Sequence, residues 1–169
     1  SIPPIRLSGV DTMQLAARVA EEHRTHGATV ICVDEGGIGA GVVDRLKQLG
    51  LPVVGVQFGG KPLGAVRLQD GVKVANRRAE IWAIMREWLQ GGAIPDDQTL
   101  ADDLTGVEYS FNSRDEIQLE RKDHMKARGL ASPDDGDGLA LTFAVPVLPS
   151  YEDEDEWVGD EGRSEAGGY

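Results

Sequence analysis

Hydrophobic residues in the first sixty positions alternate between helical and strand-like spacing. Asp11, with Gln14 three residues later, forms a capping-box pattern that begins an amphipathic helix, and Gly27 ends it. Apolar runs on either side of a second helical stretch, which ends at Gly50, are typical of buried strands. The expected order is strand 4–8, helix 11–26, strand 28–33, helix 38–49 and strand 53–58. This βαβαβ order predicts parallel strands with right-handed connections.

The rest of the chain combines one strongly amphipathic helix, at 76–90, with shorter elements. The apolar residues of this helix that we expect in the core are Ile81, Trp82, Ile84, Met85, Trp88 and Leu89. Further along we expect a polar strand pair around 107–111 and 117–120, a short element at 123–128 and a helix at 134–145. The pattern predicts an α/β fold in one domain over residues 1–149.

Composition supports a single domain, because 169 residues that are 40% hydrophobic can bury one core. The only cysteine, Cys32, lies in an apolar strand, which excludes an internal disulfide framework or cysteine zinc site and indicates core packing. No apolar run is long enough to cross a membrane, and the N-terminus lacks a secretory signal pattern. We therefore expect a soluble, intracellular protein without a membrane partner. The start at Ser1, close to a strand, suggests a fragment of a longer protein.

The net charge of −12 is concentrated at the C-terminus, where residues 151–169 hold eight acidic residues and one arginine. About −5 therefore remains for the body of the chain. The acidic segment 150–169 has too little apolar surface to offset the entropy of ordering, so we predict that it is disordered. It is either a solvated terminus or a docking peptide for a partner protein.

Acidic residues stand at the ends of two predicted elements, the strand at 28–33 and the helix at 134–145, and are candidates for a catalytic site. An apolar strand ends at Asp34 and is followed by Glu35 and four glycines before the next helix. A second acidic cluster opens the helix at 134–145, where Asp134 and Asp137 share one helical face and Asp135 points away. Carboxylates at element ends suit hard metal ions. With no catalytic Ser/His pairing, they indicate metal-assisted phosphoryl chemistry.

The glycine-rich turn also has two simpler interpretations. Strand, glycine turn and helix is the arrangement of a dinucleotide site, but the spacing is wrong, since Val42 stands where the third glycine is required. Asp34 and Glu35 would also repel a phosphate. Alternatively, the glycines only permit a tight strand-to-helix turn, which is compatible with a metal role for Asp34.

Basic side chains in the body of the chain are candidates for contacts with nucleic-acid phosphates, although lysine and arginine on helices are ordinarily only solvated. They are Lys61, Lys73, Arg77, Arg78, Arg121, Lys122, Lys126 and Arg128. The histidines show no metal-ligand spacing, and we interpret them as surface or local hydrogen-bonding residues.

Four segments carry a family resemblance. They are the strand end and glycine turn VDEGGIGAGVVDRL at 33–46, NRRAEIW at 76–82, and the basic and acidic stretches at 120–130 and 132–143. In combination they resemble the C-terminal nuclease domain of the large terminase subunit of tailed bacteriophages, over about residues 5–145. The resemblance implies an RNase H-like fold, a mixed sheet flanked by helices. It also implies cutting of concatemeric viral DNA, in a subunit whose N-terminal domain is a packaging ATPase.

The resemblance implies roles for specific residues. Asp34 and Asp137 match catalytic positions, and Asp134 matches a further metal-proximal position. Together these three would hold two Mg²⁺ or Mn²⁺ ions, which activate water and stabilise the leaving oxygen. Glu35 is either another ligand or a solvated neighbour. The residues expected to contact DNA are Arg77, Arg78, Arg121, Lys122 and Lys126, of which Arg121 and Lys122 match a basic stretch in the family.

One feature of the family pattern is missing. The family's first catalytic aspartate lies on a hairpin before the segment that begins at Ile5, and residues 1–4 contain no carboxylate. We therefore expect that the first strands were lost or are provided by another chain. This chain alone is then a weak or inactive nuclease, whereas its longer parent is active.

The main hypothesis is a metal-dependent endonuclease domain that acts on double-stranded DNA in the cytoplasm of the infected host. Its other partners would be the portal protein and the small terminase subunit, through the parent protein. The alternative is a catalytically silent module that guides DNA or docks on the portal. A third interpretation is another RNase H-like nuclease, such as a junction-resolving enzyme, which shares the metal chemistry but not the segments at 76–82 and 132–143 together.

Overall fold

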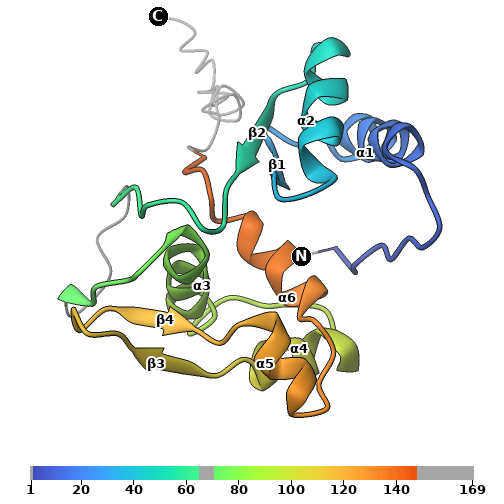
Figure 1. Ribbon diagram of the computed structural model, residues 1–169. Coiled ribbons are helices and arrows are strands. Elements are labelled where there is room, and N and C mark those ends of the chain that lie inside the picture. Colours follow the sequence, from blue (N-terminus) through green and yellow to red (C-terminus); the bar gives the residue numbers. More distant parts are fainter. Residues whose placement is uncertain (1, 65–70, 148–169) are drawn as a thin grey trace, which may run out of the picture.

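The chain folds into two small sheets with helices packed against them (Figure 1). The computed structural model describes residues 2–64 and 71–147. The helices in this part are α1 (Thr12–His26), α2 (Gly39–Gln48), α3 (Arg77–Trp88), α4 (Gln98–Gly106), α5 (Lys122–Ala127) and α6 (Asp134–Leu141). The strands are β1 (Ile31–Asp34), β2 (Val53–Val56), β3 (Tyr109–Phe111) and β4 (Ile117–Leu119). The α/β class predicted from the sequence is confirmed.

The first helices and strands form one layered unit. The predicted capping box is present at α1, because Asp11 Oδ1 accepts from Gln14 N at 2.7 Å and Gln14 Oε1 accepts from Asp11 N at 2.9 Å. β1 and β2 pair in parallel, so that Asp34 lies opposite Val56. Ala16, Val42 and Leu46 are buried between α1 and α2. The predicted strand–helix–strand order is therefore confirmed in this unit.

The second unit is built around α3, whose N-cap Asn76 accepts a hydrogen bond from Ala79 N. Ile81, Trp82 and Met85 are buried, as the apolar stripe predicts. Trp88 is 41% exposed, although the prediction placed it in the core. It lies at the last turn of the helix, where its ring meets Phe143 with centroids 5.4 Å apart.

Helix α6 connects the two units. It contacts α3, α4 and β1, and Figure 1 shows it between the parallel pair and the hairpin of β3 and β4. Ala140 and Ala144 pack into the same core cluster as Val56 and Ile81. Small residues of α6 and of the turn after it thus let this part of the chain lie close to both units. The helix ends at Leu141, earlier than the expected residue 145.

One further prediction about the elements is wrong, and one helix was missed. Residues 4–8 form no strand, which leaves one βαβ unit instead of βαβαβ. Pro3 and Pro4 lack amide donors, and Arg6 instead bridges Asp97 and Asp135. The helix α4, which begins after the N-cap Asp97, was not predicted.

The strand pair in the last third is confirmed as the antiparallel β3–β4 hairpin, to which Val74 adds a single parallel bridge at Ile117. Among residues 2–64 and 71–147 there is no helix with the length and apolar character needed to cross a bilayer. The predicted disordered segment 150–169 lies outside the described residues.

Candidate metal centre

The first predicted ligand, Asp34, is held in a tight turn at the end of β1. Its Oδ1 accepts a hydrogen bond from Gly36 N at 3.0 Å, and Gly39 N donates to Gly36 O at 3.1 Å. Gly37 has φ +58°, in the left-handed region that glycine adopts without strain. The glycines therefore serve the tight turn that the sequence also suggested, with the partly exposed Asp34 at its start.

The neighbouring Glu35 faces β2. Gln57 Nε2 donates to its Oε2 at 3.5 Å, and its carboxyl group lies over Gly55, where a Cβ would come within 2.8 Å of the carboxyl carbon. Glu35 thus lies across the end of the parallel pair, in contact with residues of β2 and the turn after it.

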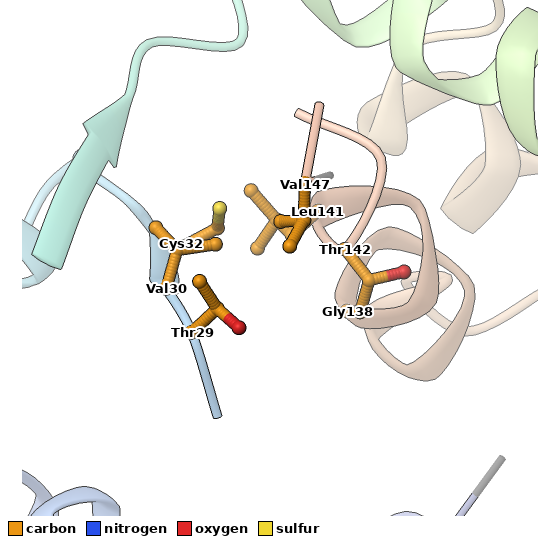
Figure 2. Close-up of a pocket in the computed structure, with 7 residues that line it drawn as sticks. All are labelled: Thr29, Val30, Cys32, Gly138, Leu141, Thr142 and Val147. Atoms are coloured by element: carbon orange, nitrogen blue, oxygen red, sulfur yellow. The ribbon is translucent and has the colours of Figure 1, made fainter. Parts of the chain in front are cut away.

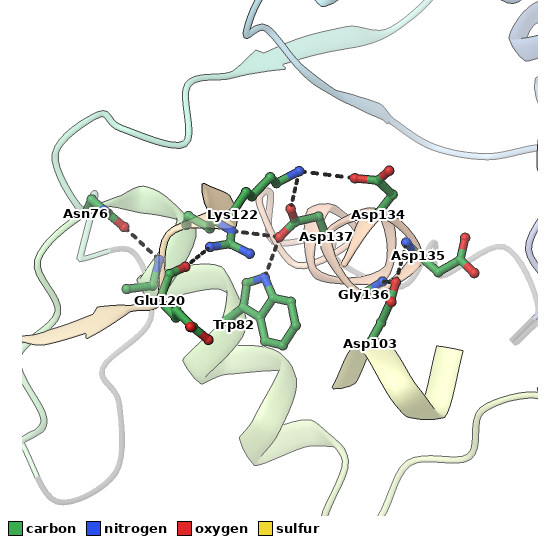
Figure 3. A network of polar contacts seen from close by, with 11 residues as sticks. Asn76, Trp82, Asp103, Glu120, Lys122, Asp134, Asp135, Gly136 and Asp137 are labelled. Atoms are coloured by element: carbon green, nitrogen blue, oxygen red, sulfur yellow. Dashed lines mark hydrogen bonds and ion pairs between the residues drawn. The ribbon is translucent and has the colours of Figure 1, made fainter. Parts of the chain in front are cut away.

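Asp137 is the most constrained carboxylate of the second cluster, and only 4% of it is exposed. Arg78 Nε donates to its Oδ1 at 2.8 Å, and Trp82 Nε1 donates to the same oxygen at 2.9 Å (Figure 3). Its Oδ2 is buried and pairs with Lys122, whose Nζ lies 3.0 Å away. Oδ1 of Asp137 therefore has two hydrogen-bond donors, whereas Oδ2 has the flexible side chain of Lys122 as its partner.

Lys122 joins the two acids on the shared face of α6. Its Nζ lies 3.2 Å from Asp134 Oδ1 as well as 3.0 Å from Asp137 Oδ2. Burial works to lower the pKa of Lys122, but its contacts with Asp137 and Asp134 outweigh burial and raise the pKa. The side chain of Asp134 is 78% exposed, so the pair of acids has one buried and one open member.

Asp135 points away from this pair, as predicted, and contributes to a different contact. Arg6 Nε donates to its Oδ2 at 2.7 Å. Asp103 on α4 accepts from the backbone amides of Asp135 and Gly136, at 2.8 and 3.1 Å. Burial raises the pKa of Asp103 and outweighs these hydrogen bonds. Asp103 thus caps the first turn of α6, a role with no sequence signal because α4 itself was not predicted.

Two of the basic residues expected to contact DNA are inside the protein. Arg77 is 5% exposed and pairs with the buried Glu80, and it also donates to the carbonyl oxygen of Ala144. Arg78 is 9% exposed and is committed to Asp137 and to the carbonyl oxygen of Glu120. The predicted DNA contact does not fit these two residues, because neither guanidinium is open to a phosphate.

The other three predicted contacts lie on or beside α5. Arg121 and Lys126 are exposed, whereas Lys122 is half-buried against the acids of α6. Arg121 Nε lies 3.2 Å from Asp123 on the surface. Of the five residues predicted to contact DNA, Arg121 and Lys126 are therefore the exposed ones, with Lys122 half-buried between them.

A cavity of about 260 Å³ separates the start of β1 from α6 (Figure 2). Cys32 faces it and is half-buried, and burial raises the pKa of its thiol. The residues around the cavity are small, apolar or hydroxylated: Thr29, Val30, Cys32, Gly138, Leu141, Thr142 and Val147. It contains no carboxylate from the predicted set, so it is separate from the candidate metal centre.

Within the described ranges, no three His, Cys, Asp or Glu side chains are grouped closely enough to hold a metal ion. The structure brings Asp134 and Asp137 together through Lys122, while Asp34 stands at the end of β1 and joins no such group. The three-residue ligand set stays a prediction. The feature that fits a hard cation is the buried Oδ2 of Asp137, an anionic oxygen already paired with the cationic Lys122.

No protein-family model and no curated protein sequence matches the chain. Solved structures do. The nuclease domain of the large terminase subunit gp2 of bacterial virus Sf6 is 20% identical, with a TM-score of 0.61 over 79% of this chain and 73% of that one. A mutant of the same domain with manganese gives 19% identity and a TM-score of 0.60, over 79% and 73% of the two chains.

The large terminase nuclease of the thermophilic phage G20c, solved with bound magnesium, is 17% identical, with a TM-score of 0.54 over 82% of this chain and 64% of that one. At identities this low, the structural match establishes a shared fold and nothing more. The RNase H-like fold implied by the sequence resemblance is therefore confirmed as the fold of phage terminase nuclease domains.

Proposed function

We propose that this chain is a metal-dependent nuclease domain of a phage terminase large subunit, which cuts double-stranded DNA during packaging. The observation that carries the proposal is the buried Asp137, whose Oδ1 is held by two donors while its Oδ2 faces the displaceable Lys122 ammonium, in a fold shared with terminase nucleases. Related domains are solved with manganese, calcium, cobalt and magnesium. Mg²⁺ or Mn²⁺ is accordingly the proposed cofactor.

The residues proposed to hold the metal are Asp137, Asp134 and Asp34. Two bound ions would supply an activated water and stabilise the leaving oxygen of the phosphodiester. Asp137 contributes a carboxylate fixed by Arg78 and Trp82, and Asp134 contributes an exposed carboxylate on the same helical face. Lys122 neutralises both acids in this structure, so its ammonium group and a cation compete for the same oxygens.

The proposed DNA path runs over α5, where Arg121 and Lys126 are exposed close to Lys122. Their contacts would be with phosphates, which fits cutting with little sequence preference. Through a longer parent protein, the portal and the small terminase subunit are the further proposed partners, and the cytoplasm of the infected bacterium is the proposed location.

A second candidate function is a silent module that guides DNA or docks on the portal. The observation that favours it is the lack, in residues 2–64 and 71–147, of three metal-ligating side chains in one group. In this alternative Lys122 is a permanent counter-ion of Asp137 rather than one that a metal displaces.

Cleavage of supercoiled plasmid in Mn²⁺ distinguishes the two functions. We expect at most weak nicking by this chain, which EDTA should stop and Asp137→Asn should abolish. Asp135→Asn is the matched control, because it removes an acid from the same helix whose partner is Arg6. No cutting by any variant, with DNA binding retained, would favour the silent module. Equal cutting by wild type and Asp137→Asn would overturn the proposed site.

A further inference from the structure

We infer that Arg78 and Trp82 are positioning residues that select which oxygen of Asp137 meets a cation. The inference rests on the proposed metal-dependent function and deepens it. Both residues lie on α3, four positions apart and therefore on the same helical face, and both donate to Oδ1 (Figure 3). Two donors on one carboxylate oxygen leave Oδ2 as the oxygen available to a metal.

The two donors are themselves fixed. Arg78 donates through Nη1 to the carbonyl oxygen of Glu120 at 3.1 Å, and its guanidinium carbon lies 5.6 Å from the ring centroid of Trp82. Arg78 and Trp82 are 9% and 7% exposed. Arg78 is thus held by the Glu120 carbonyl, and Trp82 is held by its contact with Arg78. These contacts keep both donors in place independently of a metal.

The backbone of α6 is shaped to admit the indole. A Cβ at Gly136 would lie 3.0 Å from Cη2 and 3.2 Å from Cζ2 of Trp82, closer than ordinary side-chain contacts. The residue before Asp137 is therefore small where the ring passes. The ring can pass this close to the backbone of α6 because glycine has no Cβ.

The consequence for metal binding is a one-oxygen ligand with a fixed direction. A carboxylate free to rotate can offer either oxygen or both to a metal, whereas Asp137 can offer only Oδ2, the oxygen beside Lys122 Nζ. Arg78 and Trp82 together hold Oδ1, and we call this pair of donors the clasp. By holding Oδ1, the clasp sets the position that an ion bound at Oδ2 would take. Neither residue touches the ion in this arrangement.

Trp82→Phe removes the N–H donor and keeps an aromatic ring. We expect Mn²⁺ affinity, measured by electron paramagnetic resonance of free Mn²⁺, to fall by about 10-fold or more, as is usual when a partner of a metal ligand is lost. Trp88→Phe is the matched control, because this tryptophan of the same helix packs on Phe143 instead of Asp137. We expect it to leave Mn²⁺ affinity unchanged.

Arg78→Lys provides an independent variant that keeps the charge. A lysine ammonium cannot reproduce the fork that joins Asp137 and the Glu120 carbonyl, so we again expect weaker Mn²⁺ binding. In an Asp137→Asn background, Trp82→Phe should cause no further loss, since the ligand that it positions is gone. Thermal unfolding confirms that each variant is folded before its affinity is compared.

The outcomes separate this inference from the proposed function. Mn²⁺ binding that Asp137→Asn abolishes but folded Trp82→Phe and Arg78→Lys leave intact would overturn the positioning role and keep the metal site. Wild-type protein that binds no Mn²⁺ through Asp137 would overturn both. A fall in the melting temperature of Trp82→Phe with unchanged Mn²⁺ affinity would show that the clasp serves stability alone.

Discussion

Gly39 lies directly against the backbone of Asp34. A Cβ built at Gly39 would stand 1.8 Å from the carbonyl oxygen of Asp34 and 2.9 Å from its carbonyl carbon. Both atoms belong to the main chain, so no side-chain rotation could relieve the overlap. The start of α2 can therefore pack against the end of β1 only with glycine at this position.

Gly39→Ala should consequently destabilise the protein by about 3 kcal/mol or more, the upper end for overpacking a buried site. Urea unfolding followed by circular dichroism measures the change. The control is Gly41→Ala, since a Cβ there meets only Thr12 Cγ2 at 3.7 Å. Alanine at this helical position should be neutral or stabilise by up to about 1 kcal/mol. Equal loss from both substitutions would refute the close approach.

Lys122→Met tests the competition between this lysine and a metal. Without the ammonium group, Asp137 Oδ2 has lost its ion-pair partner, so we expect the metal-free protein to lose about 1–3 kcal/mol of stability. The rise in melting temperature on adding Mn²⁺ should be larger than in wild type, because no cation has to leave. Lys126→Met, one turn further along α5 and exposed, should show the wild-type rise. Equal Mn²⁺ effects in both variants would exclude competition.

The ion pair between Glu120 and Arg128 predicts a specific pH dependence. Hydrogen bonds from Arg128 lower the pKa of Glu120 below its ordinary value of 4.5. The stabilisation is therefore complete above pH 4.5 and is lost as the pH falls through the lower pKa of the folded state. The melting temperature of Glu120→Gln should lie below that of wild type at pH 7, with the difference shrinking toward pH 3. A difference that stays constant over this range would contradict the prediction.

Charge reversal on α5 tests the proposed DNA path. Arg121→Glu with Lys126→Glu should weaken binding of duplex DNA and reduce the dependence of log Kd on log salt by about 1.8, because two phosphate contacts are lost. Lys47→Glu changes an exposed cation on α2, away from α5, and serves as the control. Fluorescence anisotropy at several salt concentrations gives both slopes. A slope that the double variant leaves unchanged would remove α5 from the path.

The sequence predicted correctly two helices whose first residues include a capping side chain. The capping box of Asp11 and Gln14 and the N-cap at Asn76 both hold in the structure. The strand expected at 4–8 fails because a strand requires a paired neighbour, and Arg6 instead forms ion pairs with distant acids. Helix α4 has an N-cap, Asp97, and an apolar side with Leu100 and Leu104, but it spans only 9 residues, which leaves a short signal in the sequence.

Residue types predicted part of the candidate site, but tertiary pairing determined its details. Asp134 and Asp137 share a face as the helical period requires, and Lys122 joins them. Arg78 was expected at the surface because nothing near it in the sequence is its partner; the partner is Asp137, 59 positions away. Trp82 was assigned to the core from the apolar stripe, which says nothing about where an indole N–H will donate.

The distance in sequence between α3 and α6, which pack together in the fold, also bears on the order of folding. The parallel pair closes over one short helix and the hairpin over a few residues, so both form through contacts between near neighbours. The bond between Arg78 and Asp137 closes a loop of 59 positions and must wait for α6 to dock. The candidate metal centre therefore depends on a contact far less local than those that pair the strands of either sheet. Until α6 docks on α3, Asp137 lacks both of the donors that orient its carboxylate.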